Sequence, residues 1–207
     1  LAFQQCFMGW LIELKNATDS DDDSPAEKTV LAIDGKTMRR SFDRGNGLGA
    51  MHLVSVWLTN TGLTLAQVAT EEKSNEITAI PEVLKLVDIR GAIITIDAMG
   101  TQTAIAEQIV SQGGDYVLAV KGNQESLHQS VIEFVDAHVS DDFKGTGARR
   151  HVVEEQKHGR TERRFYIQFP VPDDLKGRDR WASLRTIGVV VYESESPGKK
   201  HRTEIRY

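Results

Sequence analysis

Cysteine and long apolar runs are scarce in this sequence. Its 207 residues include one cysteine, Cys6, which has no partner for an internal disulfide and is interpreted as a buried thiol. No apolar stretch approaches the roughly 20 residues that a membrane-spanning helix needs, and residues 1–15 lack the basic start of a secretory signal. These absences argue against a membrane protein and predict a chain that works in the reducing cytoplasm.

A surplus of positive charge is also missing. Lysine and arginine number 25 against 30 aspartates and glutamates, which gives a net charge of -5. The molecule as a whole is therefore no general binder of polyanions, and any contact with nucleic acid must be local. Hydrophobic residues make up 40% and charged residues 27%, which excludes disorder as a description of the whole chain. We expect one or two packed domains.

Composition and periodicity divide the chain into three parts. Residues 1–27 predict a helix followed by an acidic linker. Residues 28–139 predict an α/β core in the order βββαβαβα, with strands near 29–33, 52–58, 63–68, 92–97 and 116–120 and helices near 77–87, 105–110 and 127–135. Residues 140–207 predict a β-rich insertion, with a hairpin over 151–155 and 163–169 and a further strand over 186–192.

The two ends of the sequence predict a truncated chain. The sequence starts at Leu1 without an initiator methionine, and residues 203–207 alternate like a strand that stops before it is finished. We therefore expect pieces to be missing at both ends.

Two aspartates each end an apolar, strand-like run. Asp34 follows residues 29–33, and Asp97 follows residues 92–96. Sites in open α/β sheets form outside the carboxyl ends of the strands, so neighbouring strands would bring both carboxylates together. Such a pair is tolerated when a cation lies between the carboxylates, and oxygen ligands suit Mg²⁺ or Mn²⁺. Either aspartate alone would be read as a turn residue or a helix cap.

Several ordered segments resemble one family. They are 32–41 (AIDGKTMRRS), 73–77 (KSNEI), 97–98 (DA), 115–118 (DYVL), 121–124 (KGNQ) and 158–164 (HGRTERR). Together they resemble the bacterial insertion-sequence DDE transposases of the H-repeat-associated (ISAs-type) family, and the resemblance runs from about residue 3 to the last residue.

The resemblance implies a ribonuclease H-like core in which two aspartates and a glutamate hold two Mg²⁺ ions, with Mn²⁺ as an alternative. Asp34 matches the first aspartate and Asp97 the second. The implied partners are the transposon ends and the target DNA, which are cleaved and joined by phosphoryl transfer without a covalent protein intermediate. The Trp-x-Ile-Glu-Asn-like motif that carries the glutamate does not occur here. We therefore expect this fragment to lack its third carboxylate and to show negligible turnover, and we interpret Glu162 as a partner of arginines.

Three groups of residues are candidates for contacts with DNA. Lys36, Arg39 and Arg40 follow the first aspartate, and an exposed basic loop is the competing interpretation. Lys121 and Asn123 follow the strand near 116–120, where Asn123 is expected to cap a helix. His158, Arg160 and Arg163 belong to a basic patch on the hairpin that also includes Arg149, Arg150, Lys157 and Arg164. Trp57 and Trp181 are expected in the core.

Three functions remain open at this point. The first is a transposase fragment associated with the bacterial nucleoid in the cytoplasm. The second is an inactive remnant, or a module that binds DNA or pairs with an intact transposase. The third is a metal-dependent nuclease that does not transpose. Whether the chain forms a homo-oligomer is likewise left open by the sequence.

Overall fold

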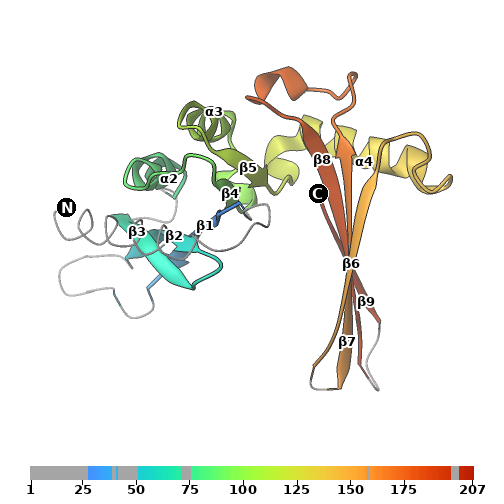
Figure 1. Ribbon diagram of the computed structural model, residues 1–207, viewed down its shortest axis with the longest axis horizontal. Coiled ribbons are helices and arrows are strands. Elements are labelled where there is room, and N and C mark those ends of the chain that lie inside the picture. The colour runs from blue at the N-terminus through green and yellow to red at the C-terminus, as the bar shows by residue number, and fades with distance from the viewer. Residues whose placement is uncertain (1–27, 39–40, 42–50, 71–75, 158, 197–200) are drawn as a thin grey trace, which may run out of the picture. The chain divides into compact units, whose positions relative to one another are not determined.

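The computed structural model describes residues 28–38, 41, 51–70, 76–157, 159–196 and 201–207. The helix and acidic linker expected within 1–27, together with Arg39, Arg40 and His158, lie outside the described residues. The chain divides into two compact units, the first up to Leu118 and the second from Ala119 onward (Figure 1). None of the described helices is long and apolar enough to cross a membrane.

The first unit is built on a five-stranded mixed sheet in the order β3-β2-β1-β4-β5. Its strands are β1 (Val30–Thr37), β2 (His52–Leu58), β3 (Leu63–Thr70), β4 (Ile93–Ile96) and β5 (Asp115–Leu118). The first three pair antiparallel, whereas β4 is parallel to both β1 and β5. Helix α2 (Glu76–Leu84) precedes β4, and α3 (Thr103–Ser111) follows it. The predicted mixed α/β order of these elements is confirmed.

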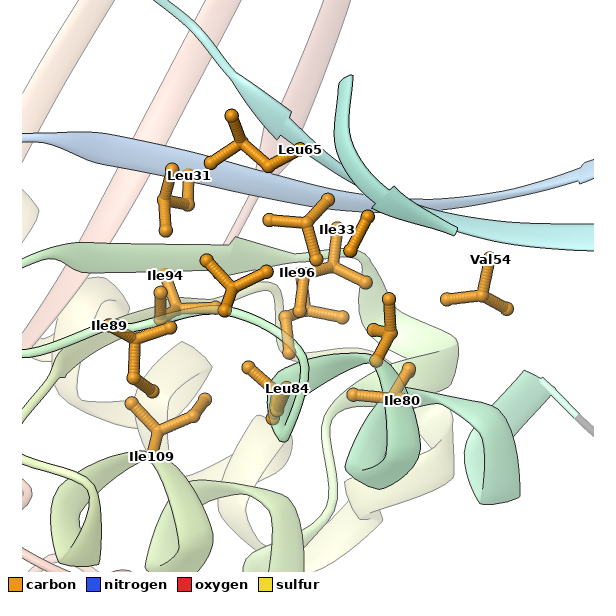
Figure 2. Packing of buried hydrophobic residues seen from close by; sticks show 14 of the residues in the cluster. Leu31, Ile33, Val54, Leu65, Ile80, Leu84, Ile89, Ile94, Ile96 and Ile109 are labelled. Atoms are coloured by element: carbon orange, nitrogen blue, oxygen red, sulfur yellow. The ribbon is translucent and has the colours of Figure 1, made fainter. Parts of the chain in front are cut away.

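Helices cover one face of this sheet because its strands alternate. Leu31 and Ile33 on β1 are buried, as are Ile94 and Ile96 at the paired positions of β4. Figure 2 shows these side chains packed with those of Ile80, Leu84 and Ile109 from α2 and α3. This is the face on which burial of apolar surface stabilises the unit.

The other face of the sheet carries exposed apolar side chains. Trp57 on β2 is 43% exposed and Val117 on β5 is 61% exposed. The expectation that Trp57 belongs to the core is therefore wrong, because strand alternation places it opposite its buried neighbour Val56. Trp181, at 6% exposure, is buried as expected.

The second unit contains an antiparallel four-stranded sheet in the order β6-β7-β8-β9. Its strands are β6 (Arg149–Lys157), β7 (Arg160–Pro170), β8 (Thr186–Glu195) and β9 (Arg202–Arg206). Helix α4 (Glu125–Val139) crosses one end of this sheet (Figure 1). Phe169 on β7 is fully buried there, with ring centroids 5.3 Å from Phe134 and 5.1 Å from Phe143.

The third predicted core helix forms as α4, but it belongs to the second unit. Its buried residues are Leu127, Ser130, Val131 and Val135, and the backbone N–H of Lys176 donates to Ser130 Oγ at 3.2 Å. The compact units divide after residue 118, whereas the sequence analysis ended the core at residue 139. The apolar stripe of α4 indicated a helix correctly without indicating which sheet it covers.

The first and last residues of the second unit lie together. The backbone N–H of Val120 donates to the carbonyl oxygen of Tyr207 at 2.8 Å. The Tyr207 ring meets the His128 ring edge-on, at 5.4 Å between centroids.

The start of α4 differs from the prediction in one detail. Asn123 lies within a short 3₁₀ helix, η3 (Gly122–Gln124), and Gln124 occupies the N-cap position of α4. The expectation that Asn123 caps this helix is therefore wrong. The 3₁₀ turn moves the first residue of α4 further along the chain, which is common at helix N-termini.

Candidate active site

Asp34 and Asp97 lie at the same level of two neighbouring strands. Ile33 on β1 is paired in parallel with Ile96 on β4. Asp34 directly follows Ile33 in the sequence, and Asp97 directly follows Ile96. Both residues are exposed. By alternation Asp34, on β1, belongs to the face opposite the helices, and Asp97 caps the turn that directly follows β4, the neighbouring strand about 4.8 Å away. The structure thus brings the two predicted aspartates together.

Asp97 is held in place by the turn that follows β4. Its Oδ1 accepts hydrogen bonds from the backbone N–H groups of Met99 at 3.0 Å and Gly100 at 3.4 Å, as the cap of the 3₁₀ helix η2 (Ala98–Gly100). The hydroxyl of Thr101 donates to the Asp97 carbonyl at 3.2 Å, and Thr101 is fully buried. Capping therefore fixes the carboxylate while its second oxygen, Oδ2, keeps its lone pairs for a ligand.

The turn after β4 needs glycine at position 100. A Cβ atom at this buried position would lie 2.7 Å from Ile80 Cδ1 and still closer to Cγ2 of Ile96. The hollow beside Asp97 is bordered by Ile33, Ile80, Ile96 and Gly100 and has a volume of about 10 Å³. That is room for one water-sized sphere.

Replacement of Gly100 by alanine is expected to destabilise the first unit. The added methyl group overlaps Ile80 and Ile96 in a packed region, and overpacking of this kind costs about 1–3 kcal/mol. Urea unfolding followed by circular dichroism would measure the loss. Gly122→Ala is the matched control, because no atom lies within 4 Å of the position its Cβ would take. Equal stability of the two variants would contradict this account of the turn.

Two further side chains lie on the same face as Asp34. Lys36 is two residues along β1, so it faces the same side, and it is exposed. Trp57 on β2 is paired with Ala32, which is two residues before Asp34. The sequence predicts Lys36 as a DNA contact and Trp57 as a core residue. The position of Trp57 on the exposed face follows only from the strand pairing, because the sequence alone does not say which face of β2 the helices cover.

Lys121 and Asn123 belong to the second unit. Both are exposed at the short helix η3. Lys121 is electrostatically coupled to Glu204 on β9, whose pKa is lowered mainly by a hydrogen bond from Arg206. Their proposed contact with DNA stays a prediction.

The arginines of the predicted hairpin patch are paired with glutamates. Arg163 Nε donates to Glu154 Oε2 at 2.8 Å, and this hydrogen bond raises the pKa of Arg163. Glu162, which is 8% exposed, contacts both Arg160 and Arg164. The interpretation of Glu162 as a partner of arginines is confirmed. These ion pairs offset much of the positive charge that the sequence suggested for this surface.

The donor chemistry of the aspartate pair fits a hard divalent cation. Asp34 and Asp97 offer carboxylate oxygens at one edge of the sheet, and Mg²⁺ is typically held by one or two carboxylates together with water and phosphate oxygens. Among the residues that the structure describes, no group of three or more histidine, cysteine, aspartate or glutamate side chains forms a metal site.

Comparison with known proteins identifies the family. Residues 25–195 match the family described as "Transposase DDE domain". The chain is 41% identical over 190 residues to "H repeat-associated putative transposase YhhI" of Escherichia coli strain K12, which covers 91% of this chain and 47% of that protein. It is 44% identical over 175 residues to "Putative transposase YncI" of the same strain, which covers 84% of this chain and 66% of that protein.

Similarity to solved structures is slight. A piggyBac transposase synaptic complex with hairpin DNA matches with a TM-score of 0.36 and 9% identity, covering 78% of this chain and 32% of that one. The chain spans about half the length of the H repeat-associated relative, at 47%. The family match and the sequence identity together show that the chain belongs to the DDE-domain transposases, among their H repeat-associated members.

Proposed function

We propose that this chain supplies the first two metal-binding aspartates of a transposase that cleaves and joins DNA strands. The observation that carries the proposal is the register of β1 and β4, which sets the exposed residues Asp34 and Asp97 at the same level of two neighbouring strands. The two residues are far apart in the sequence, so they come close only because β1 and β4 are neighbouring strands. In open α/β sheets, the carboxyl ends of such central strands are where ligands bind.

We further propose that the first unit is a ribonuclease H-like core. Three antiparallel strands followed by two parallel strands, in the order β3-β2-β1-β4-β5, support this assignment. Both aspartates then lie on the two central strands, β1 and β4, where the connection changes from antiparallel to parallel. The second unit would be an insertion, which the pairing of Val120 with Tyr207 supports.

In this proposal Asp34 and Asp97 hold Mg²⁺, with Mn²⁺ as a substitute and two ions in the complete site. Bound ions of this kind neutralise charge on the attacking and leaving oxygens during phosphoryl transfer. Lys36, on the same face, would bind a phosphate of the DNA backbone. Trp57 is aligned with Ala32, two residues from Asp34 in the other direction along β1, and it is 43% exposed, so it could contact a base.

A third carboxylate would have to come from outside the described residues. The relative YhhI is about twice as long as the stretch it shares with this chain. We propose that such additional residues supply the glutamate in a complete enzyme. By itself the aspartate pair then binds metal weakly, because fewer anionic ligands hold the ion.

Titration with Mn²⁺ tests the proposal on the chain as it is. Paramagnetic broadening of backbone amide signals should begin at residues around Asp34 and Asp97. Asp34→Asn or Asp97→Asn removes one of two anionic ligands while keeping the side-chain shape, so the apparent dissociation constant should rise at least about tenfold, equal to about 1.4 kcal/mol.

Glu107→Gln is the matched control for this titration. Glu107 is an exposed carboxylate on α3, which packs on the opposite side of the sheet, and its replacement should leave the broadening unchanged. Broadening that is absent, or that survives both aspartate replacements, would contradict the metal pair. That result would favour a non-catalytic module.

A further inference from the structure

Strand β6 forms an exposed edge of the second sheet. It pairs on one side with β7 and stands last in the strand order. Its residues 149–152, 154 and 156 are exposed. Such an edge presents a row of backbone N–H and C=O groups that can pair with another strand. Over 149–155 the strand reads RRHVVEE, so two arginines and two glutamates flank a short middle segment.

We propose that β6 pairs antiparallel with β6 of a second copy of this chain, around a two-fold axis at Val152. In this arrangement Val152 faces Val152 of the second copy. Arg150 then faces Glu154, and Arg149 faces Glu155, each pair occurring twice because the interface is symmetric. Opposite charges directly across an antiparallel pair stabilise it, and valine pairs do the same. The strand is thus complementary to itself in charge.

The alternation of the strand agrees with this register. A two-fold axis perpendicular to the sheet places the same face of both copies on the same side. Two residues that lie opposite each other across the axis must therefore point to the same side of the sheet. Arg150, Val152 and Glu154 share one face by alternation, and Arg149 and Glu155 share the other. Both charge pairs are therefore matched in sign and in face.

Neighbouring symmetric registers lose these contacts. Centring the pair on Val153 sets Val152 against Glu154 and Arg149 against Lys157, which brings like charges together. Centring it on His151 sets both arginines against valines and leaves Glu154 opposite Ala148. Like charges directly opposite each other destabilise a strand pair. The register centred on Val152 is the one that sets a glutamate opposite each arginine. Arg150 already donates from Nη1 to Asp142 Oδ2 at 3.0 Å, and the remaining N–H groups of its guanidinium can donate to Glu154 of the second copy.

Pairing at Val152 also extends an apolar stripe across the sheet. Val152 is aligned with Phe165 on β7, Val191 on β8 and Ile205 on β9. Val152 is 54% exposed and Ile205 is 52% exposed. This stripe lies beyond the Phe169 cluster that α4 covers. Joining two copies at Val152 makes one stripe continuous over both sheets and removes part of it from water.

Glu154 on β6 is accessible to an additional partner. It accepts a hydrogen bond from Arg163 at 2.8 Å, and its side chain is still 55% exposed. A carboxylate has about four acceptor positions. Glu154 can thus bridge Arg163 of its own β7 and Arg150 of the second copy. The Glu155 side chain, which accepts a hydrogen bond from Arg164 at 3.2 Å, is 38% exposed on the other face of the strand.

A disulfide cross-link tests the register. In a Cys6→Ala background, Val152→Cys places two thiols opposite each other at the axis, and mild oxidation should give a covalent dimer. Glu154→Cys is the matched control, because its two thiols would be offset by four residues, about 13 Å along the strands, which is beyond the reach of a disulfide. Cross-linking that is no faster for Val152→Cys than for Glu154→Cys would overturn the proposal.

The association itself is measured by sedimentation over a range of protein concentrations. The average mass should rise toward twice the 23.0 kDa of one chain. Val152→Lys sets two like charges at the axis and should weaken the dimer roughly tenfold, with folding checked by circular dichroism. A monomer at all concentrations would overturn the proposal. So would a Val152→Lys variant with unchanged mass and tighter DNA binding, because β6 would then be a nucleic-acid surface.

Discussion

Phe169→Ala is expected to be among the most destabilising single changes in the chain. Phe169 is fully buried where α4 meets the second sheet, and its ring contacts those of Phe134 and Phe143. Truncation of a buried phenylalanine costs about 3–5 kcal/mol, because transfer energy is lost and a cavity remains. Aromatic contacts of this geometry add to that loss. The second unit should therefore unfold at a much lower denaturant concentration.

Hydrogen exchange of individual amides is the measurement that separates the two units. Amides of β7 and β8 should lose protection in Phe169→Ala, whereas amides of β1 and β4 should keep theirs if the units unfold separately. Val139→Ala, at a 59% exposed position at the end of α4, is the control and should change stability by less than about 0.5 kcal/mol. Protection in β7 that matches the unsubstituted chain would contradict the role given to Phe169.

Local patterns were enough to predict the elements of the fold. The run that ends at Ile33 and the run that ends at Ile96 are mostly apolar, and each forms a strand with neighbours on both sides. The turn at residues 60–62 and the alternation on either side predicted the β2–β3 hairpin. These signals lie within a few residues of one another, so no tertiary information is needed to read them.

The assignment of elements to units required the tertiary structure. The apolar stripe of Leu127, Val131 and Val135 predicted α4, but a stripe of this kind can pack against any apolar surface. The partner it has here, around Phe169, is far away in the sequence. The exposure of Trp57 has the same cause, because alternation defines two faces of β2 without saying which one the helices cover.

The candidate site shows the same division between local and tertiary information. The sequence predicts that Asp34 and Asp97 each end an apolar strand. This is wrong for Asp34, because β1 continues to Thr37 through its pairing with β2, whereas Asp97 directly follows β4. The common level of the two residues depends on the β1–β4 register. The sequence also suggested a basic hairpin, and its arginines prove to be partnered by cross-strand glutamates such as Glu154. Charge counted along a chain does not show which charges neutralise one another across a sheet.

Ile94→Ala is expected to weaken the sheet that carries the aspartates. Ile94 is fully buried on β4, between Leu31 of β1 and Tyr116 of β5, and it packs toward α2 and α3 (Figure 2). Removal of its side chain to Cβ should cost about 2–5 kcal/mol. Val117→Ala, at a 61% exposed position on the neighbouring strand, is the matched control and should cost much less. Urea unfolding monitored through amides of β1 and β4 would measure both.

The same variant connects the core to the proposed metal site. A ligand that binds only the folded state stabilises it, by about 2.7 kcal/mol at 100 times its dissociation constant. Mn²⁺ should therefore restore part of the stability lost in Ile94→Ala and should restore none when Asp97→Asn is added. Recovery in the double variant would mean that Mn²⁺ acts elsewhere. No recovery in either variant would mean that Asp34 and Asp97, although side by side, do not hold the ion.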